Sequence, residues 1–459
     1  KSRGLGDVYK RQRYYSVDLG RLQRVGGTLG VPLGTDEEWC AVYGGRLPDG
    51  EVKVYFLDHQ ELYGRDGIYG TKSEPSFPDN LRRFALLSRG AFQLCRSLDW
   101  IPDIMHAHDW PAAIVPVSLK TRESEGLFAG TGSMLTIHNL GHQGVFPAEE
   151  FVHLPLAPEL YHSAGFESPD GINLLQAGLE NADVLTTVSP TYAEEIQTPE
   201  FGCGLDALLR RRRKDLYGVL NGMDYDIWNP ETDLHIPANF SHRNLDGKSV
   251  NKEALQRAFG LPVDPEVPLV AMVSRLADQK GFGELCGPTH GSLFSICDDF
   301  KLQFVILGTG EAWCEEELAV LDGKLPNLSV ALEFSDPLAH LIEAGADFFL
   351  MPSVYEPCGL SQMYSLRYGT LPIVRRTGGL ADTVENYDQE SGKGTGFVFD
   401  LLTPRALYDT VGWAVWAWYN QPEHILAMRR RAMQKRFSWE TSAQRYLELY
   451  RLAAGERSD

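Results

Sequence analysis

Short apolar segments alternate with amphipathic segments along most of the 459-residue chain. Ten of the apolar segments are predicted to be β-strands: 52–59, 103–109, 133–139, 183–189 and 216–221 in the first half, and 268–274, 302–308, 328–334, 347–353 and 371–376 in the second. Several are apolar at almost every position, which is typical of parallel strands covered by helices on both faces. The pattern therefore predicts an α/β protein with doubly wound parallel sheets.

A polar, proline-containing stretch separates the two halves of the pattern. Residues 229–250 lack helical periodicity and are interpreted as a linker, with a new helix starting at Asn251. We therefore expect two α/β domains, at 13–228 and 251–437, followed by a helical segment within 438–459.

Nearly every predicted strand ends in a polar or glycine-rich cluster. In open α/β sheets ligands bind at the carboxyl ends of the strands. If the two sheets face each other, these clusters would line one cleft between the domains.

The clusters of the second half suit an anionic ligand. Arg275 and Lys280 follow one strand, where two cations would neutralise the charge of a diphosphate. Gly378 and Gly379 directly precede a predicted helix, whose N–H groups favour a phosphate. Each feature alone is also typical of an ordinary turn or a solvated surface, and Glu356, just after an apolar strand, is by itself more typical of a helix N-terminus than of a catalytic site.

The clusters of the first half suit a neutral, hydroxyl-rich ligand. His138 and Asn139 follow a strand, and an imidazole with an amide offers both donors and acceptors to sugar hydroxyls. His106 and His108 share one face of a strand, but no third ligand with suitable spacing accompanies them, so we predict no metal site. The DxD spacing of Asp224 and Asp226 lies in a turn and is discounted.

Composition narrows the class of partner. The net charge is −19, which argues against nucleic acid or an anionic membrane as the main partner. No apolar run reaches the roughly 20 residues of a membrane helix, and no signal peptide is apparent. Seven scattered cysteines without CxxC spacing favour a reducing compartment. We expect a cytoplasmic protein.

Six motifs at these strand ends occur along the chain in this order: HAHDW, IHNLGHQG, LNGMD, SRLADQKG, YEPCGLSQ and TGGLADTV. Together they resemble the ADP-glucose-dependent glycogen synthases of bacteria and the starch synthases of plants, from about Tyr14 to the C-terminus. The resemblance implies a GT-B fold, with an acceptor-side Rossmann-like domain, a nucleotide-sugar-binding Rossmann-like domain and a last helix that crosses back to the first domain.

The resemblance also implies a reaction. Glucose would pass from ADP-glucose to the non-reducing end of an α-1,4-glucan, glycogen or starch, with retention of configuration and without a metal or other cofactor. The location would be the cytoplasm of a bacterium or a plastid of a plant or alga. The oligomeric state stays open.

The resemblance assigns roles to residues of the second half. Arg275 and Lys280 match cations on the donor phosphates, and Glu356 matches the carboxylate near the sugar, either holding hydroxyls or stabilising oxocarbenium-like charge. The residues expected to bind the donor are Phe334, Cys358, Gly359, Thr377, Gly378, Gly379 and Leu380, with Phe334 against the adenine.

In the first half, His138 matches a histidine at the glucose and the reacting bond. Asn139 and Asn221 match amides that contact sugar, and Asp109 matches the aspartate of an HDWH motif near the acceptor. Pro111 stands where the family usually has a histidine. Residue 364 is Tyr, where many related GT-B transferases have a second Glu and glycogen synthases do not.

The start departs furthest from the family. Lys1 matches a lysine at the donor phosphates, but Arg3 stands on a glycine position and YKRQ passes to Arg13 without the expected helix and strand. We interpret residues 1–12 as a non-native stretch, the alternative being a deletion. Two other functions stay open: a retaining GT-B transferase with another nucleotide sugar, and an inactive glucan-binding protein.

Overall fold

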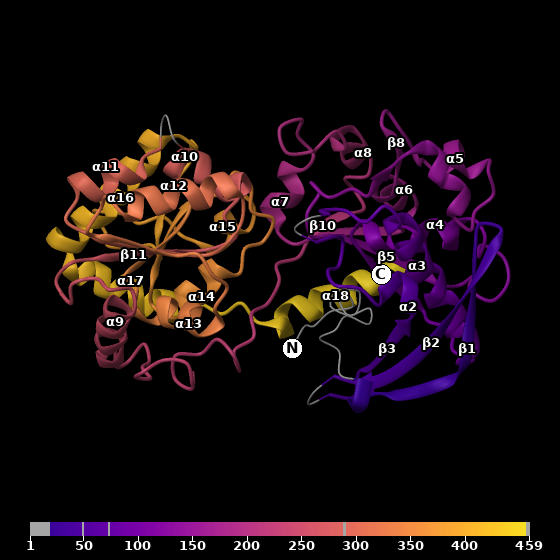
Figure 1. Ribbon diagram of the computed structural model, residues 1–459, viewed down its shortest axis with the longest axis horizontal. Coiled ribbons are helices and arrows are strands. Elements are labelled where there is room, and N and C mark those ends of the chain that lie inside the picture. Colours follow the sequence, from indigo (N-terminus) through magenta and orange to yellow (C-terminus); the bar gives the residue numbers. More distant parts are fainter. Residues whose placement is uncertain (1–18, 48–49, 72–73, 288–290, 456–459) are drawn as a thin grey trace. The chain divides into compact units, whose positions relative to one another are not determined.

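The computed structural model describes residues 19–47, 50–71, 74–287 and 291–455. They form two compact units, shown in Figure 1. Unit 1 comprises the residues up to Val188, Ala193–Val219 and those from Ala443 onward; unit 2 comprises Ser189–Tyr192 and Leu220–Ser442. Asn221, expected on the acceptor side, is thereby part of unit 2. Lys1 and residues 1–12 lie outside the described residues.

Unit 1 contains a four-stranded parallel sheet with the order β10-β9-β5-β4. Its strands are β4 (Ile104–His108), β5 (Gly132–Ile137), β9 (Val184–Thr187) and β10 (Leu216–Gly218). All four were expected from their apolar sequences. β5 and β9 are buried at every position, as befits strands covered on both faces.

The start of unit 1 differs from the prediction. The segment predicted at 52–59 is a strand, β3 (Lys53–Asp58), but it pairs antiparallel with β2 (Asp36–Arg46), which pairs antiparallel with β1 (Gln23–Leu33). The β1–β2 hairpin turns at Gly34, whose φ of 56° suits glycine. The hairpin was not predicted, because burial alternates along the end of β1 and the sequence of that strand contains no continuous apolar run.

Three short strands and several helices complete unit 1. The strands, joined in an antiparallel sheet, are β6 (Val145–Phe146), β7 (Glu167–Ser168) and β8 (Gly171–Asn173). The helices are α2 (Gln60–Tyr63), α3 (Asn80–Ser97), α4 (Ile114–Lys120), α5 (Leu160–Ser163), α6 (Leu174–Asn181), α7 (Pro190–Glu195), α8 (Asp206–Arg211) and α18 (Trp439–Ala453), with the 3-10 turns η1 (Leu19–Arg21), η2 (Trp110–Ala112) and η3 (Ala148–His153). The first residues of α7 and of α18 belong to unit 2.

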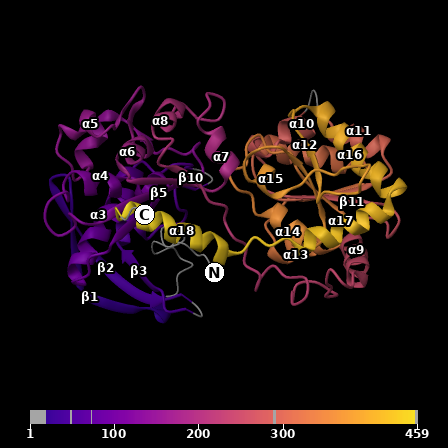
Figure 2. The ribbon, with the colours of Figure 1, turned by 180° about the vertical axis from the view of Figure 1, so that it is seen from behind.

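α18 returns from the end of the chain to the sheet of unit 1. Its Leu449 and Ala453 are buried with Met134, Val184 and Val219 in one hydrophobic cluster. Figures 1 and 2 both show the helix against β5 and β10. The last helix is therefore part of the core of unit 1.

Unit 2 is built on a six-stranded sheet with the order β13-β12-β11-β14-β15-β16, in which all neighbours are parallel. The strands are β11 (Leu269–Val273), β12 (Gln303–Leu307), β13 (Leu328–Ala331), β14 (Phe348–Met351), β15 (Leu371–Arg375) and β16 (Phe397–Phe399). The first five were predicted. This is the doubly wound order, in which the direction of winding reverses between β11 and β14.

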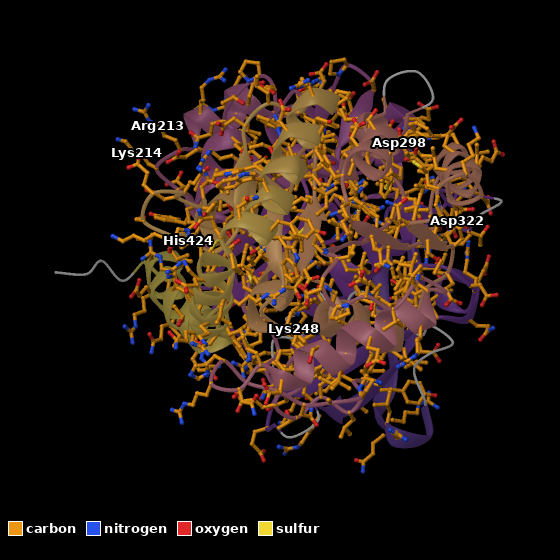
Figure 3. All side chains as sticks on the ribbon, turned by 90° about the vertical axis from the view of Figure 1, so that its left-hand side faces the viewer. Arg213, Lys214, Lys248, Asp298, Asp322 and His424 are labelled. Carbon is orange, nitrogen blue, oxygen red and sulfur yellow. The ribbon has the colours of Figure 1, made fainter. Side chains whose placement is uncertain are left out.

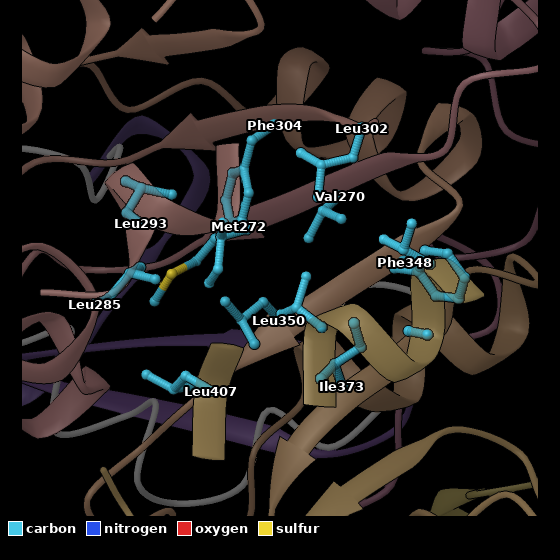
Figure 4. Close-up of a cluster of buried hydrophobic side chains, with 14 of the residues drawn as sticks. Val270, Met272, Leu285, Leu293, Leu302, Phe304, Phe348, Leu350, Ile373 and Leu407 are labelled. Atoms are coloured by element: carbon cyan, nitrogen blue, oxygen red, sulfur yellow. The ribbon is translucent and has the colours of Figure 1, made fainter. Parts of the chain in front are cut away.

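Helices cover both faces of this sheet. They are α9 (Asp246–Ala258), α10 (Phe282–Cys286), α11 (Leu293–Asp299), α12 (Ala312–Asp322), α13 (Asp336–Gly345), α14 (Ser361–Arg367), α15 (Gly378–Thr383), α16 (Pro404–Asn420) and α17 (Pro422–Gln434), with the 3-10 turn η4 (Asp278–Lys280). On one face, Leu285, Leu293 and Leu407 pack on Val270 and Phe304 (Figure 4). On the other face, α9 and α13 bury a second cluster.

The linker helix α9 starts at Asp246, five residues before the predicted start. Its first turn is polar, so periodicity does not indicate it. The Lys248 side chain is buried there, and its ammonium donates to Ala344 O at 3.0 Å and Thr370 Oγ1 at 2.7 Å. Figure 3 labels this residue. Tertiary contacts thus hold a turn that the sequence pattern leaves undefined.

The basic run 210–214 begins in the last turn of α8 and continues past its end, and its Arg213 and Lys214 are exposed and point outward (Figure 3). Within the described ranges, no helix combines the length and apolar character that a membrane crossing requires.

Candidate active site

In unit 2, the predicted site residues follow the carboxyl ends of parallel strands. Arg275 and Lys280 follow β11, Phe334 follows β13, Glu356 follows β14, and Gly378 follows β15. Because these strands are parallel neighbours of one sheet, the residues share one edge of it. This edge includes the switch point between β11 and β14, where open sheets bind ligands.

The centre of this edge is a buried carboxylate with two partners. Glu356 is only 6% exposed, and its Oε2 accepts from the Lys280 ammonium at 2.6 Å and from Ser353 Oγ at 2.9 Å. A carboxylate at such a site requires a charged partner and hydrogen bonds to offset its desolvation. The structure brings together Lys280 and Glu356, which lie far apart in sequence.

A small cavity opens beside this ion pair. Its volume is about 250 Å³, and its polar lining comes from Ser274, Arg275, Lys280, Ser353 and Ser361. Arg275 is exposed, and its guanidinium donates to Gln279 at 3.3 Å. The cavity therefore combines two cations with three hydroxyl groups, a set that matches the acceptor oxygens of a phosphate.

The glycines of the two neighbouring loops are required by close packing. A Cβ on Gly378 would lie 2.0 Å from Glu356 O, and one on Gly379 would lie 1.9 Å from Cys358 O. Gly378 and Gly359 also have positive φ, 42° and 67°. These glycines let the loop after β15 lie directly against the 356–359 loop.

The N–H groups of this loop are used within the protein. Gly379 N donates to Glu356 O at 3.1 Å, and Leu380 N donates to Thr377 O at 3.1 Å. α15 has only six residues, so its dipole is that of little more than one turn. In this structure the loop fixes the position of Glu356, and the cationic side chains provide most of the positive charge.

Asn221 and Cys358 meet in the same unit. The Asn221 backbone N–H hydrogen bonds to the Cys358 thiol, and burial raises the pKa of Cys358 to about 12. The sulfur is therefore a neutral thiol at physiological pH, so it packs and accepts and does not act as a nucleophile.

Two aromatic residues of unit 2 differ in exposure. Phe334, expected against an adenine, is 86% exposed after β13. Tyr364 lies where related transferases have a carboxylate. Its ring stacks on Trp228 with centroids 4.1 Å apart, and burial raises its pKa to about 12. Tyr364 is thus a neutral packing group.

In unit 1, Asp109 holds the start of the loop after β5. Its Oδ1 accepts from His138 N at 2.7 Å and from Asn139 N at 3.5 Å. The residue has φ 53° and ψ −173°, an unusual conformation for a residue with a side chain. Such strain is maintained at functional sites by surrounding contacts, and here it aims the carboxylate at two site residues.

His138 also contacts a second histidine. His108 Nδ1 and His138 Nε2 lie 2.9 Å apart, and His106 stacks on His108 with centroids separated by 4.2 Å. Burial lowers the pKa of His106 to about 3 and holds that of His108 well below its usual range. Both rings are therefore neutral at physiological pH.

Unit 1 also contains a larger cavity, of about 560 Å³. Asp109 and Trp110 of the HAHDW motif line it together with Asn139, and so do Tyr69 and Phe146, which the sequence did not single out. The ring centroid of Trp110 lies 5.7 Å from the ring centroid of Tyr69 and 5.8 Å from that of Phe146. Aromatic faces beside a carboxylate and an amide form a surface suited to sugar rings.

The possible metal ligands have other partners. Asp224 Oδ1 accepts from Asp226 N at 2.9 Å, an Asx turn. His106 contacts Tyr450 Oη at 2.8 Å and Thr136 Oγ1 at 2.6 Å. Across the part of the chain that the structure describes, no group of three or more His, Cys, Asp or Glu could hold a metal ion. That the protein works without a metal stays a prediction.

Sequence reasoning missed three further polar contacts. Ser353 lies three residues before Glu356, and its position beside a strand end was the available signal. Asp382, four residues after Gly378, accepts from Ser189 Oγ and Thr191 Oγ1, both at 2.6 Å. Nothing in the sequence indicates this contact, because it joins segments distant along the chain.

Comparisons with known proteins agree with this architecture. Residues 7–211 match the family model of the starch synthase catalytic domain, and 255–420 match glycosyl transferases group 1. Glycogen synthase of Treponema denticola is 54% identical over 95% of this chain and 89% of its own length. Glycogen synthase 1 of Geobacter metallireducens is 46% identical over 97% of this chain and 88% of its own length.

Solved structures extend the comparison to the fold. The catalytic domain of starch synthase IV from Arabidopsis thaliana, bound to ADP and acarbose, is 29% identical, with a TM-score of 0.86 over 96% of this chain and 91% of that one. Sucrose-phosphate synthase from Thermosynechococcus elongatus, at 18% identity and a TM-score of 0.54 over 88% of this chain and 84% of that one, shares the fold. The chain therefore belongs to the glycogen and starch synthase family of glycosyltransferases, with the GT-B fold.

Proposed function

We propose that this glycosyltransferase uses ADP-glucose as its donor and extends the non-reducing end of an α-1,4-glucan with retention of configuration. The observation that carries the proposal is the pair of cations, Arg275 and Lys280, that line the cavity at the switch point of unit 2, with Glu356 bound to Lys280. A starch synthase 29% identical to this chain was solved with ADP and acarbose bound, which supports the same donor and acceptor class here.

The two cations account for departure of the diphosphate. An ammonium has three donors, and Glu356 occupies one of those of Lys280, which leaves the others for phosphate oxygens. Arg275 is exposed beside the same cavity. Fixed cations stabilise charge that develops on a leaving group without reorganisation. This supports catalysis without a metal ion.

The carboxylate has a different task. As the bond from glucose C1 to the β-phosphate oxygen breaks, positive charge develops on the sugar ring, which Glu356 would stabilise while holding hydroxyls. The acceptor 4-hydroxyl forms the new bond to C1 on the same face, and its proton passes to the departing phosphate oxygen. Atoms and charge balance without a covalent glucosyl-enzyme.

Unit 1 would bind the uncharged parts of the substrates, the transferred sugar and the glucan. His138 and Asn139 would contact sugar hydroxyls, and the glucan would lie in the 560 Å³ cavity beside Asp109 and Trp110. The aromatic lining suits the apolar faces of glucose rings. The expected cleft between domains stays a prediction.

Transfer of labelled glucose to glycogen tests the proposal. We expect incorporation from ADP-glucose to exceed that from UDP-glucose, and to be unchanged by EDTA. E356Q should lower kcat by about 10³-fold, whereas E390Q, at an exposed loop position, should match the wild type.

Three results would contradict parts of the proposal. Preference for UDP-glucose would reject the donor, and equal rates for E356Q and the wild type would reject the role of Glu356. Glucan binding without transfer from either donor would favour the glucan-binding alternative.

A further inference from the structure

We propose that His108 is a positioning residue that holds the His138 imidazole in one orientation and one tautomer for the transfer reaction. The inference rests on the proposed function, in which His138 contacts the transferred sugar. It adds a role for a histidine that does not line the 560 Å³ cavity, and the residues it involves all belong to unit 1.

The strand geometry brings the two rings together. His108 is the last residue of β4, and it is in register with Thr136 of the parallel neighbour β5. His138 follows the end of β5, Ile137. The rings lie with centroids 5.2 Å apart, and His108 Nδ1 is 2.9 Å from His138 Nε2. This is a hydrogen-bonding distance between two ring nitrogens.

A hydrogen bond between two imidazoles links their tautomers. A neutral imidazole has one donor and one acceptor nitrogen. With His108 neutral, a single proton lies between Nδ1 of His108 and Nε2 of His138, so the tautomer of one ring sets that of the other. The remaining nitrogen of His138, Nδ1, then presents to a sugar the donor or acceptor character that the tautomer of His108 dictates.

The ring of His108 is supported on one face by another histidine. The His106 ring stacks on it, with an interplanar angle of 27°. Both nitrogens of His106 are engaged, by Tyr450 Oη of α18 and by Thr136 Oγ1. Thr136 Oγ1 in turn contacts Thr186 Oγ1 at 2.5 Å. His108 therefore has a rigid support that reaches from the core of β9 to the last helix.

The main chain of His138 is fixed by a separate contact. Asp109 Oδ1 accepts from His138 N at 2.7 Å. Consecutive residues of β4 and its following loop thus hold His138 at two points: Asp109 holds its backbone and His108 holds its ring. Catalytic groups perform best when supporting contacts fix them within about 0.5 Å of the productive geometry, and this pair supplies two such supporting contacts.

Two substitutions separate positioning from packing. H108N keeps an amide near the place of Nδ1 and can restore the hydrogen bond, whereas H108F keeps a flat ring of similar size for the stack and removes it. We expect H108F to lower kcat by about tenfold or more, with KM for ADP-glucose and glycogen within about threefold. H108N should recover most of the loss.

NMR of ¹⁵N-histidine-labelled protein gives a readout that does not require activity. The ring nitrogen shifts of His138, assigned by their loss in H138N, should report a single tautomer in the wild type and a mixture in H108F. H162F, at an exposed histidine paired with Glu167, is the matched control and should leave both kcat and the His138 signals unchanged.

The outcomes are distinct. Two tautomers in the wild type, or wild-type kcat with unaltered His138 signals in H108F, would overturn the inference. A packing role alone would favour Phe over Asn, the reverse of the expected order. If the wild type transfers no glucose from ADP-glucose, the proposed function fails, while the NMR result still decides whether His108 fixes the ring of His138.

Discussion

The two units present different kinds of polar group at the carboxyl ends of their parallel strands. Unit 2 has an ion pair, Lys280 with Glu356, and a second cation, Arg275. Unit 1 has neutral imidazoles, His106 and His108, kept uncharged by burial. The contrast fits the two substrates proposed above, because the diphosphate of a nucleotide-sugar donor must be neutralised as it departs, whereas a glucan acceptor offers only hydroxyls and apolar ring faces.

The sheets beneath these groups also differ. The sheet of unit 2 is wound in both directions from its centre, so its site lies at a switch point. Among the described strands of the parallel sheet of unit 1, the order runs in one direction from β4 to β10, and the site residues follow β4 and β5. In both units the site residues therefore follow the carboxyl ends of parallel strands.

The largest effect is expected from separating the ion pair of unit 2. K280M leaves the Glu356 carboxylate buried with Ser353 as its remaining partner, which costs about 3–5 kcal/mol of stability, and removes a cation from the leaving group. We expect kcat to fall by at least about 10³-fold, measured by glucose transfer, with a lower urea midpoint.

A double variant sharpens this prediction. K280M/E356Q removes both charges, so it should regain much of the stability lost in K280M and none of the activity. Equal stability of K280M and the wild type would show that the pair is solvated and that unit 2 does not depend on it.

The next effect concerns the glycine contacts of unit 2. In G379A the new Cβ would meet Cys358 O, which lies 1.9 Å away, so the two loops must separate and Glu356 must move. We expect a loss of about 2–4 kcal/mol in unfolding free energy and a strong fall in kcat.

The matched control is G323A, at the end of α12. A Cβ there has its nearest neighbour at 3.6 Å and the backbone is right-handed helical, so this change should be neutral or slightly stabilising. If G379A and G323A behaved alike in urea, the close contact would be without energetic consequence.

Particular residues show what the sequence could and could not predict. All five predicted strands of unit 2 are present because most of their positions are apolar, whereas burial alternates along the end of β1, which lacks a continuous apolar run, and the β1–β2 hairpin was not predicted. Arg275, Lys280 and Glu356 were identified at strand ends, and parallel pairing brings them to one edge.

Contacts that depend on the third dimension were beyond the sequence. The shared face of His106 and His108 follows from alternation in a strand, but the contact of His108 with His138 depends on the register of β4 with β5. The N–H of Gly379 was expected to meet a phosphate, yet it donates to Glu356 O. Local sequence identifies a loop, while the neighbouring loop decides which of its groups are used.

A smaller effect should distinguish the neutral histidines of unit 1 by pH. His106 is neutral in the folded protein down to a pKa of about 3, whereas in the unfolded chain it binds a proton below about 6.5. Between these values the unfolded state binds more protons than the folded state. The unfolding free energy therefore decreases as the pH is lowered, by at most about 1.4 kcal/mol per pH unit. H106F should flatten the slope between pH 6.5 and 4.5, measured by urea unfolding.

Two buried carboxyl groups of unit 2 also affect how the unfolding free energy depends on pH, either with the opposite sign or in a different pH range. Burial raises the pKa of Glu343 to about 8, so its contribution grows as pH falls and opposes that of His106. The lowered pKa of Asp347 affects stability only as pH falls through about 3.8 and below. Both cancel when H106F is compared with the wild type, and identical slopes for the two proteins would show that His106 is protonated in the folded state.

The smallest effect is expected at the exposed aromatic of unit 2. Phe334 is 86% exposed, so F334A should leave stability within about 0.5 kcal/mol. If the ring stacks on the adenine of ADP-glucose, its loss should raise KM for the donor by about fivefold or more, since stacking on a base contributes about 1–3 kcal/mol, and leave kcat and KM for glycogen unchanged. F334Y, which keeps an aromatic face, should retain the wild-type KM. A kcat effect without a KM effect would remove Phe334 from the donor site and confine that site to the cations and loops of unit 2.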